Sequence, residues 1–249
     1  MPDSRPTPDD VRAYFSQDNV VDHYARATAA LGLWQSEEIL FNQWFEKDER
    51  ILDLGTGTGR IALGLAELGY QRVRGVDLAR PMIKKARHLA KLLETPVSFQ
   101  VMDATALGFD DGTFDDVIFG FNGLMQIPTE EARAQALREI HRVVRPDGLL
   151  CFTTHDRQAP GYRGFWKAET ERWAKGKQAP HLHELGDRYE DDGLGELYIH
   201  VPENDAVRAL LKTTGWTPLF DRLRSQIANE SQSVRDFSDD CRFWLARRG

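Results

Sequence analysis

A glycine-rich segment in the first quarter of the chain has the composition of a ligand-binding turn. Gly55, Gly57 and Gly59 alternate with threonines directly after the apolar run at residues 51–54. Glycine permits the backbone angles of a tight turn and lets the main chain approach a ligand closely. Asp53 lies at the end of the run, where its carboxylate could accept bonds from the turn or hold a cationic ligand. The segment therefore predicts a turn that binds a small molecule.

Acidic residues follow two further predicted strands. Gly57–Ala62 fits the dinucleotide fingerprint G-x-G-x-x-A, in which Asp77 would bind a ribose, so a nicotinamide or flavin enzyme is one alternative. Asp103 comes after the third strand, where a dinucleotide site has no standard use for an acid. Either aspartate could also serve only as a helix N-cap. Asp103 thus favours a different nucleotide-containing ligand.

The elements that must position these residues alternate between strand-like and helix-like patterns. Continuous apolar runs predict strands at 50–54, 72–76, 97–101, 116–119 and 149–153. Helical patterns occupy 61–68, 81–93 and 130–144 between them. Such alternation is typical of a parallel sheet covered by helices on both faces. The segments 216–223 and 241–246 are β-rich and could complete the sheet with an antiparallel strand.

Two regions lie outside this alternation. Residues 9–45 are predicted to be helical, with a break at Gly32 that gives two helices. Residues 156–200 are crowded with aromatic side chains and histidines, and a long connection of this kind is usually a functional lid. We therefore expect an α/β, Rossmann-like doubly wound sheet, mostly parallel with an antiparallel last strand, plus N-terminal helices and an inserted cap.

Residues 51–156 resemble the core of the class I S-adenosylmethionine-dependent methyltransferases. The glycine-rich segment resembles the first motif of that family, residues 75–78 the second, and residues 102–104 the corner that binds adenine. Residues 114–119 resemble the fourth strand, and residues 137–148 the helix and turn before the fifth. The order and spacing of these motifs match the family over a little under half of the chain.

The resemblance implies a cofactor, S-adenosyl-L-methionine, with S-adenosyl-L-homocysteine as its product. At Gly55 and Gly57 the backbone would run close beside the methionine part of the cofactor. Asp77 would accept hydrogen bonds from both ribose hydroxyls. Asp103 and the backbone of Ala104 would bind the adenine edge. The other implied cofactor contacts are Asp53, Thr56, Gly59, Leu78, Met82, Gly120, Phe121 and Asn122. Leu78 and Met82 would sandwich the adenine.

The same resemblance suggests residues for the methyl acceptor. Family members often fold N-terminal helices over the cofactor, so Tyr24 and Trp34 are candidate lid residues, although aromatic residues at helical spacing are more often core. Phe165 and Trp166 lie in the predicted cap, where aromatic rings could supply apolar walls to an acceptor. We expect acceptor specificity to lie in this cap.

Asn122 and His155 are the candidate catalytic residues. Both follow predicted strands, at the edge where open α/β sheets present ligands. His155 could instead bond to backbone at a hinge of the lid. His181, His183 and Glu184, with His200, have the residue types of a metal site, but this spacing without further clustering is weak, and we predict no metal.

Composition and charge limit the class of partner. The chain has 249 residues, 41% hydrophobic and 29% charged, as expected of a globular enzyme. A net charge of −7 argues against a broad nucleic-acid surface. Residues 120–124 lack the Asn/Asp-Pro-Pro-aromatic motif of enzymes that methylate DNA bases. A small-molecule acceptor is therefore the first choice, and nucleic acid is disfavoured.

The predicted organisation divides the chain into four parts. These are a tail with lid helices at 1–45, a cofactor-binding core at 46–155, a cap at 156–200 and a completion of the core sheet at 201–249. We expect a cytoplasmic protein, because the sequence has no apolar signal segment or membrane span. The two cysteines, Cys151 and Cys241, lie far apart in apolar runs without metal-ligand spacing, and we interpret them as buried free thiols in a reducing compartment. Oligomeric state and acceptor stay open. The alternatives are an RNA- or protein-modifying methyltransferase, or a protein of this fold that binds the cofactor without catalysis.

Overall fold

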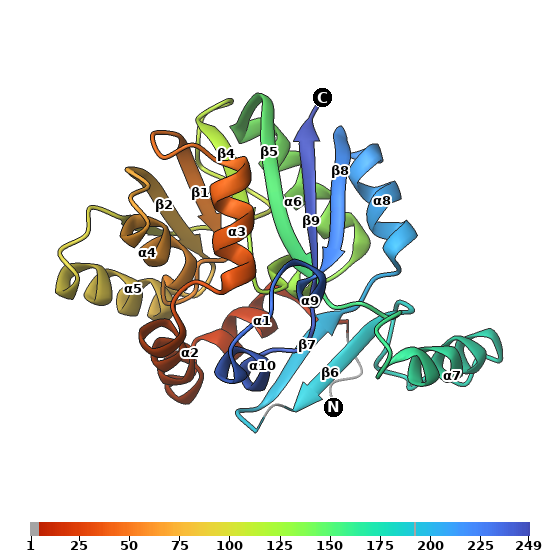
Figure 1. Ribbon diagram of the computed structural model, residues 1–249. Coiled ribbons are helices and arrows are strands. Elements are labelled where there is room, and N and C mark those ends of the chain that lie inside the picture. Colours follow the sequence, from red (N-terminus) through yellow and green to blue (C-terminus); the bar gives the residue numbers. More distant parts are fainter. Residues whose placement is uncertain (1–4, 192) are drawn as a thin grey trace.

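A seven-stranded sheet forms the centre of the molecule (Figure 1). The computed structural model describes residues 5–191 and 193–249; the first four residues of the expected tail and position 192 of the expected cap lie outside the described residues. The strand order is β3-β2-β1-β4-β5-β9-β8, and a separate hairpin pairs β6 with β7. The strands are β1 Arg50–Leu54, β2 Arg72–Asp77, β3 Ser98–Val101, β4 Phe114–Phe119, β5 Val144–Thr154, β6 Asp187–Asp191, β7 Glu196–His200, β8 Trp216–Leu223 and β9 Arg242–Arg248.

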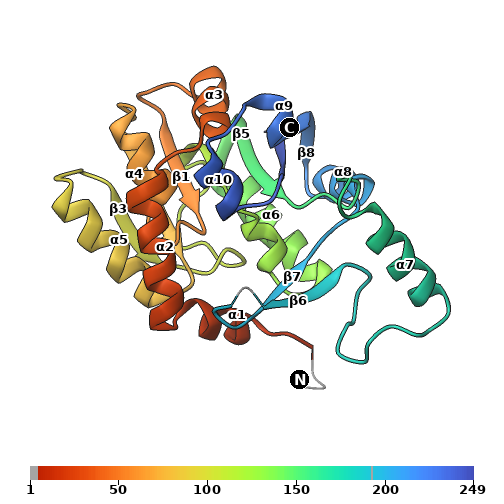
Figure 2. The same cartoon turned by 60° about the horizontal axis from the view of Figure 1, so that its bottom comes forward.

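Helices flank the sheet and cover the edge where its parallel strands end (Figures 1 and 2). They are α1 Pro8–Phe15, α2 Asp18–Leu31, α3 Gln35–Trp44, α4 Arg60–Glu67, α5 Arg80–Leu92, the 3-10 helix η1 Gly123–Gln126, α6 Glu130–Val143, α7 Arg163–Ala174, α8 Asn204–Thr213, α9 Arg224–Ile227 and α10 Gln232–Phe237.

The strand directions confirm the predicted fold class. β1 pairs in parallel with β2 and β4, with Asp53 opposite Gly75 and Ile118. β3 and β5 extend the parallel part. β9 is antiparallel to both β5 and β8, which makes it the single antiparallel strand of this sheet among the described residues. The sheet is therefore mostly parallel, with an antiparallel last strand.

Each face of the sheet has its own apolar core. On one face, side chains of α3, α4 and α5 pack with β1, β5 and β9, including Phe41, Leu65 and Phe243. On the other face, α6 and α8 pack against Leu52, Val117 and Trp244. Because both faces are covered, the central strands are apolar on both sides, which is why they read as continuous apolar runs in the sequence.

A third apolar cluster joins the N-terminal helices to the hairpin. Tyr14 and Val20 pack with Leu197 and Ile199 of β7, and with Trp166 of α7. Figure 2 shows α1 beside the β6–β7 hairpin, with α7 standing away from the sheet. The cluster holds the N-terminal helices near the carboxyl ends of the parallel strands.

Local structure differs from the sequence expectation near both ends of the chain. The N-terminal region forms three helices, because α1 ends at Phe15 and Ser16 caps it through its backbone N–H. The break at Gly32 is confirmed, and this residue has a φ of 57°. α8 before β8, and α9 and α10 in the polar stretch between β8 and β9, were also not expected. The boundary between α1 and α2 carries no glycine or proline, whereas Pro202 precedes α8 and Gly215, with a φ of 89°, follows it.

Two further expectations concern cysteines and membrane helices. Cys151 and Cys241 are free and buried, as predicted. Over the described ranges, no helix combines the length and apolar character that a membrane crossing requires.

Candidate functional site

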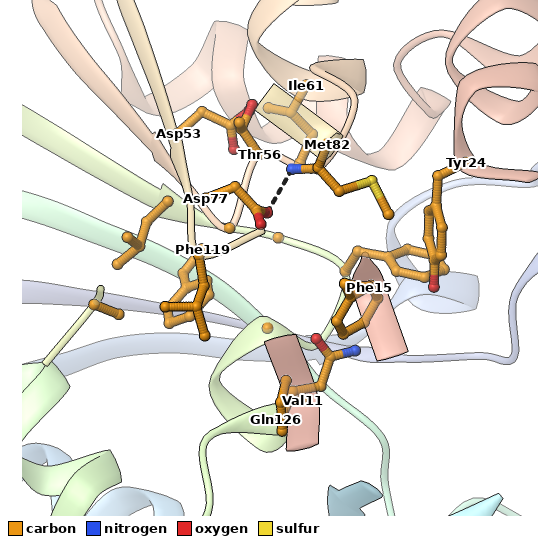
Figure 3. Close-up of a pocket in the computed structure, with 18 of the residues that line it drawn as sticks. Val11, Phe15, Tyr24, Asp53, Thr56, Ile61, Asp77, Met82, Phe119 and Gln126 are labelled. Carbon is orange, nitrogen blue, oxygen red and sulfur yellow. Dashed lines mark hydrogen bonds between the residues drawn. The ribbon is translucent and has the colours of Figure 1, made fainter. Parts of the chain in front are cut away.

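The main pocket lies at the carboxyl ends of β1, β2, β3 and β4, and α1 and α2 form its opposite wall (Figure 3). We call the side next to the strands the inner lobe. Its lining residues follow the strands or begin the next helices: residues 53–58, Arg60, Ile61, Asp77, Leu78, Met82, residues 102–105, Phe119 and Gly120.

We call the other side the outer lobe. Six of its lining side chains are large: Val11, Phe15, Tyr24, Phe121, Gln126 and Phe237. The remaining ones are Pro8, Ala27, Thr28, Gly123, Ile127 and Pro128. Every one of these twelve residues is uncharged. Figure 3 shows Val11, Phe15 and Gln126 on the side of the pocket away from Asp53.

The glycine-rich turn has the backbone geometry that its composition predicts. Gly55, Gly57 and Gly59 have φ angles of 66°, 56° and 93°, in the left-handed region that favours glycine. A Cβ on Gly55 would lie 2.9 Å from the ring of Phe119. The turn is closed by the Thr56 amide, which donates to the carbonyl of Val76 at 2.9 Å. Its main chain therefore faces the pocket without side chains in between.

Asp53 is buried beneath this turn. Its Oδ2 accepts from the hydroxyl of Thr56 and, at 3.0 Å, from the amide of Ala62 in the first turn of α4. Burial is the dominant effect on its pKa, which it raises to about 7. Asp53 thus ties the turn to α4, as one of the two sequence interpretations has it. It also lines the pocket, where a cationic ligand would favour its ionised form.

Asp77 ends β2 and holds the turn from the other side. Its Oδ2 accepts from the amide of Gly57 at 2.9 Å, the dashed contact in Figure 3, and its Oδ1 accepts from the amide of Ala79 at 2.8 Å. Burial raises the pKa of Asp77, and the two amide hydrogen bonds counteract this. The side chain combines a turn contact with a position on the pocket wall.

Asp103 lies at the far end of the inner lobe. Its Oδ1 accepts from the backbone amide and the hydroxyl of Thr105, at 2.8 Å and 2.7 Å. Ala104 lines the same wall, and Leu78 and Met82 supply apolar surface next to it. The pocket therefore has an apolar slot that ends at a carboxylate and a backbone edge.

The turn after β4 carries unusual backbone angles. Phe121 and Asn122 have φ angles of 47° and 60°, which non-glycine residues rarely adopt. A Cβ on Gly120 would lie 2.3 Å from Cδ1 of Ile61, so only glycine fits there without displacing that side chain. Gly120 and Phe121 line the pocket. Strain of this kind is common where a backbone approaches a ligand.

Asn122 and His155, the predicted catalytic residues, are neighbours but do not line the pocket. The backbone amide of Asn122 donates to the hydroxyl of Thr153 at 2.8 Å. The side-chain Nδ2 of Asn122 lies 3.3 Å from Nε2 of His155. Burial lowers the pKa of His155, so the neutral ring prevails at neutral pH. The structure brings the two side chains together behind the strained turn.

The predicted lid residues have different positions. Tyr24 lines the outer lobe, where its ring centroid is 5.9 Å from those of Phe15 and Phe121. Trp34 is buried outside the pocket, between the guanidinium groups of Arg60 and Arg224, which lie 4.5 Å and 5.0 Å from its ring centroid. Of the residues predicted to contact the cofactor, only Gly59 and Asn122 do not line the pocket.

Phe165 and Trp166 lie on α7 and do not line the pocket. The guanidinium of Arg157 is 4.4 Å from the ring centroid of Trp166, and that of Arg188 is 4.4 Å from that of Phe165. Trp166 is buried in the third apolar cluster, whereas Phe165 is exposed. Phe165 therefore contacts only the insert in these interactions, while Trp166 helps to join the insert to the N-terminal helices.

Several outer-lobe residues had not been selected from the sequence. Val11 and Phe15 lie in the region predicted to be helical, but the sequence gives no indication of what that helix faces. Gln126 and Phe237 are 111 positions apart in the sequence, yet both line this pocket. Apolar residues that recur every three to four positions indicate that one face of a helix is buried. They do not indicate which part of the protein covers that face.

A buried ion pair joins the N-terminal helices to the glycine-rich turn. Arg60 donates to both carboxylate oxygens of Glu37, at 2.6 Å and 2.7 Å, and to the carbonyl of Gly32 at 2.9 Å. Glu37 also accepts from the amide of Trp34 at 2.9 Å. Thr28 and Thr58 are joined by a 2.7 Å hydroxyl contact. The lid helices and the turn are therefore one connected unit.

A second cavity of about 370 Å³ lies on the other side of η1, between α6, α8 and the hairpin. Next to it, ligand-type atoms of Glu184, Asp187 and His200 lie within 4.8 Å of one another. Asp187 accepts from the hydroxyl of Tyr198 and pairs with Nδ1 of His200, each at 2.9 Å, and Arg133 pairs with Glu184. Protein groups therefore already satisfy these carboxylates.

The fold and the pocket together define a class of protein. The glycine-rich turn after β1, Asp77 at the end of β2 and Asp103 after β3 lie where the resemblance implies, in a sheet whose parallel strands have the order 3-2-1-4-5. Residues 51–148 match the family model of a methyltransferase domain. This part of the chain is therefore a methyltransferase domain, with the fold and motifs of the class I S-adenosylmethionine-dependent enzymes.

Relatives and solved structures share this core. A demethylmenaquinone methyltransferase from Thermus thermophilus is 44% identical over 103 residues, which are 41% of this chain and 45% of that protein. The chain spans about half the length of the curated relatives it matches.

Two structural neighbours extend over nearly the whole chain. The [4+2]-cyclase SpnF has a TM-score of 0.71 at 17% identity, covering 98% of this chain and 97% of that chain. A 1,6-didemethyltoxoflavin-N1-methyltransferase from Burkholderia thailandensis has a TM-score of 0.63 at 18% identity, covering 100% and 93%. At this identity the likeness concerns the fold alone.

Proposed function

We propose that this protein transfers a methyl group from S-adenosylmethionine to a nucleophilic atom of a small-molecule acceptor. The observation that carries the proposal is the two-lobed pocket. Its inner lobe has the carboxylates and bare backbone that a nucleoside and an amino acid need, and its outer lobe opens directly onto it. One ligand in each lobe would place two reactants side by side.

The residues of the inner lobe fit the cofactor. Asp77 would bind the ribose and Asp103 the adenine amino group, with Leu78 and Met82 against the ring faces. The turn at Gly55–Gly57 and the strained backbone of Gly120 and Phe121 would bind the methionine part. When bound, the cofactor supplies an electrophilic methyl group on a sulfonium.

The remaining residues would orient the acceptor and exclude water. α1 and α2 cover the pocket, and Phe15, Tyr24, Phe121 and Phe237 surround the outer lobe with half-buried rings. Asn122 and His155 would act through the strained turn that they support. Their side chains lie behind the pocket wall, so we propose a positioning role for them, reached through Phe121.

The relatives support a small-molecule acceptor. The proteins from Thermus thermophilus and Burkholderia thailandensis carry the names of methyltransferases for a demethylmenaquinone and a didemethyltoxoflavin. The cyclase SpnF favours a second candidate, since its name assigns a different reaction to a protein of this fold. A protein that binds the cofactor without methyl transfer is therefore the main alternative.

Two measurements on the purified full chain test the proposal. Calorimetry with S-adenosylmethionine and S-adenosylhomocysteine is expected to give saturable binding of both. A screen of a metabolite library is expected to give acceptor-dependent release of S-adenosylhomocysteine. Cofactor binding without release across the library favours the non-catalytic alternative, and failure to bind either compound contradicts the proposal. Acceptor activity on RNA with a steep loss in salt would favour a nucleic-acid substrate.

A further inference from the structure

We infer that the acceptor is an uncharged, flat ring compound that is free in solution and binds in the outer lobe. The inference rests on the proposed function and specifies its substrate class. It is carried by the distribution of charge in the pocket. All four charged residues that line the pocket, Asp53, Arg60, Asp77 and Asp103, belong to the inner lobe.

Those four side chains are also engaged within the protein. Asp53 and Asp77 accept from the backbone of the glycine-rich turn or its helix, and Asp103 accepts from Thr105. Arg60 is held by Glu37 in a buried pair. None of them extends from an element that forms the outer lobe. An acceptor there meets no opposite charge from the protein.

Desolvation therefore discriminates against charged acceptors. An anion entering the outer lobe would lose its hydration. Among the described residues that line the lobe, the side chains that carry donors are those of Gln126, Tyr24 and Thr28, and all three are uncharged. The hydroxyl of Thr28 is already engaged with the Tyr24 carbonyl and with Thr58. A cation would face the positive sulfonium of the cofactor with no carboxylate to offset it. An uncharged acceptor incurs neither cost.

The rings around the lobe favour a flat acceptor. Phe15, Tyr24, Phe121 and Phe237 contact one another edge-on or tilted, with centroids 5.4–6.3 Å apart. Each is half-buried, so part of every ring is left for a ligand. Contacts between aromatic rings contribute beyond the area they bury, by up to roughly tenfold in affinity for each pair.

Gln126 is the polar group that could orient such a ring. Its carboxamide is turned into the pocket beside Phe15 in Figure 3, and it lines the lobe at the end of η1. No hydrogen bond of its side chain to another described residue was found. A carboxamide can both donate and accept, which suits a ring nitrogen, carbonyl or hydroxyl.

The rim of the lobe distinguishes a free molecule from a base in a nucleic acid. Asp9 and Asp10 lie in the first turn of α1, next to the lining residues Pro8 and Val11. Hydrogen bonds from Thr7 lower the pKa of Asp10, so its carboxylate is ionised at neutral pH. Asp9 is paired with Arg12 at 2.7 Å, so the carboxylate of Asp10 leaves a net negative charge in this turn, which would repel a phosphate backbone.

The test uses three rigid probes of similar size: 2-naphthol, which is flat and uncharged at pH 7, 2-naphthoate, which is flat and anionic, and decahydro-2-naphthol, which is uncharged and not flat. Their affinities are measured for the full chain saturated with S-adenosylhomocysteine. We expect 2-naphthol to bind at least tenfold more tightly than either of the others. Equal or tighter binding of 2-naphthoate or of the saturated alcohol overturns the inference.

A gain-of-function variant makes the result independent of damage to the fold. Gln126→Arg introduces a cation into the lobe and is expected to raise the affinity for 2-naphthoate at least tenfold. Gln71→Arg makes the same change at an exposed position before β2, at the opposite end of the sheet, and is expected to change nothing. No gain with Gln126→Arg, or the same gain with Gln71→Arg, contradicts a binding site in the outer lobe.

Two controls separate this inference from the proposed function. If S-adenosylhomocysteine does not bind, the proposed function fails together with the inference. If it binds and the probes show no discrimination, only the inference fails. Displacement of 2-naphthol by a short single-stranded RNA at low salt would show that the lobe takes a nucleobase instead, and would also overturn the inference.

Discussion

The two lobes of the pocket are built in opposite ways. The inner lobe comes from residues 53–120, a continuous stretch in which each strand ends at a glycine-rich turn or an aspartate. The outer lobe combines α1, α2, η1 and α10, from Pro8 to Phe237. One lobe is polar, charged and local in sequence, while the other is apolar, uncharged and assembled from distant segments. The difference indicates that a cofactor site can be built from neighbouring residues of one segment, whereas an acceptor site depends on how distant helices pack together.

The connection between the two lobes is expected to have the largest energetic effect. Glu37→Ala removes the partner of the buried Arg60 guanidinium and should lower the free energy of unfolding by about 3–5 kcal/mol. Glu38→Ala, at the exposed neighbouring position, is the matched control. Chemical denaturation of both variants measures the difference. Equal stability of the two variants would mean that the lid helices and the glycine-rich turn are not coupled, and that the two lobes are not joined by this ion pair.

The insert is expected to lie outside both lobes. Trp166→Ala should cost about 3 kcal/mol of stability, since the ring is buried in the third apolar cluster. Phe165→Ala, on the exposed side of α7, should cost less than about 1 kcal/mol. In the folded variants, affinity for S-adenosylmethionine should stay within about threefold. Loss of acceptor binding with an unchanged melting temperature would instead support the sequence expectation that the insert sets specificity.

The inner lobe should depend on Asp77 more than on any exposed carboxylate. Asp77→Ala removes a charge-assisted contact expected to contribute about 1.5–3 kcal/mol, so affinity for S-adenosylmethionine should fall roughly tenfold to hundredfold. Asp110→Ala, at an exposed position, is the control. Since Asp77 also accepts from Gly57 and Ala79, a thermal melt must accompany the calorimetry. Unchanged affinity in a folded variant would refute its assignment to the cofactor.

The smallest expected effect is a pH dependence of cofactor binding. The pKa of Asp53 is about 7 in the unliganded protein, because burial favours the protonated form. A cationic cofactor lowers this pKa, so binding releases a proton, and affinity should rise as pH increases through about 5 to 7 and level off above. Calorimetry in buffers of different ionisation enthalpy measures the proton. Asp53→Asn should abolish the dependence, and a persistent slope would assign it to another group.

The same pKa has a consequence for folding. The pKa of Asp53 is raised from 3.8 in its ordinary state to about 7 in the fold. Below pH 3.8 both states are protonated and this contribution to stability is fully present. It is lost as pH rises toward 7, because the unfolded chain ionises first. The buried carboxylate is thus a cost to folding at neutral pH, at a position where the ligand needs it.

Much of the inner lobe could be predicted from the sequence. Gly55, Gly57 and Asp77 are recognisable because a tight turn and a strand end constrain residue type over a few positions. The strand Arg50–Leu54 and the segment Trp216–Leu223 were predicted with the bounds that the structure has. The alternation of strand and helix patterns therefore predicted the fold class, and the motifs that carry the family resemblance implied the cofactor.

The outer lobe could not be predicted in the same way. The sequence expectation placed acceptor contacts at Tyr24 and Trp34 and in the aromatic-rich residues 156–200. Of these candidates Tyr24 lines the pocket, whereas Trp34, Phe165 and Trp166 do not. Phe15 and Phe237, which line it without having been selected, lie in helical segments with no distinguishing motif. An aromatic side chain has the same sequence signature whether it fills a core or borders a cavity.

The sequence by itself determined the alternation of strands and helices, the glycine-rich turn and the aspartates after the second and third strands, because each depends on backbone angles and hydrogen bonds between near neighbours. Only the tertiary structure decided that α1, η1 and α10 meet over that turn, that Trp34 is held between two arginines, and that Asn122 and His155 lie behind the pocket wall. Those features depend on how long-range packing orients whole helices, and the apolar pattern of one helix does not record which partner it buries against.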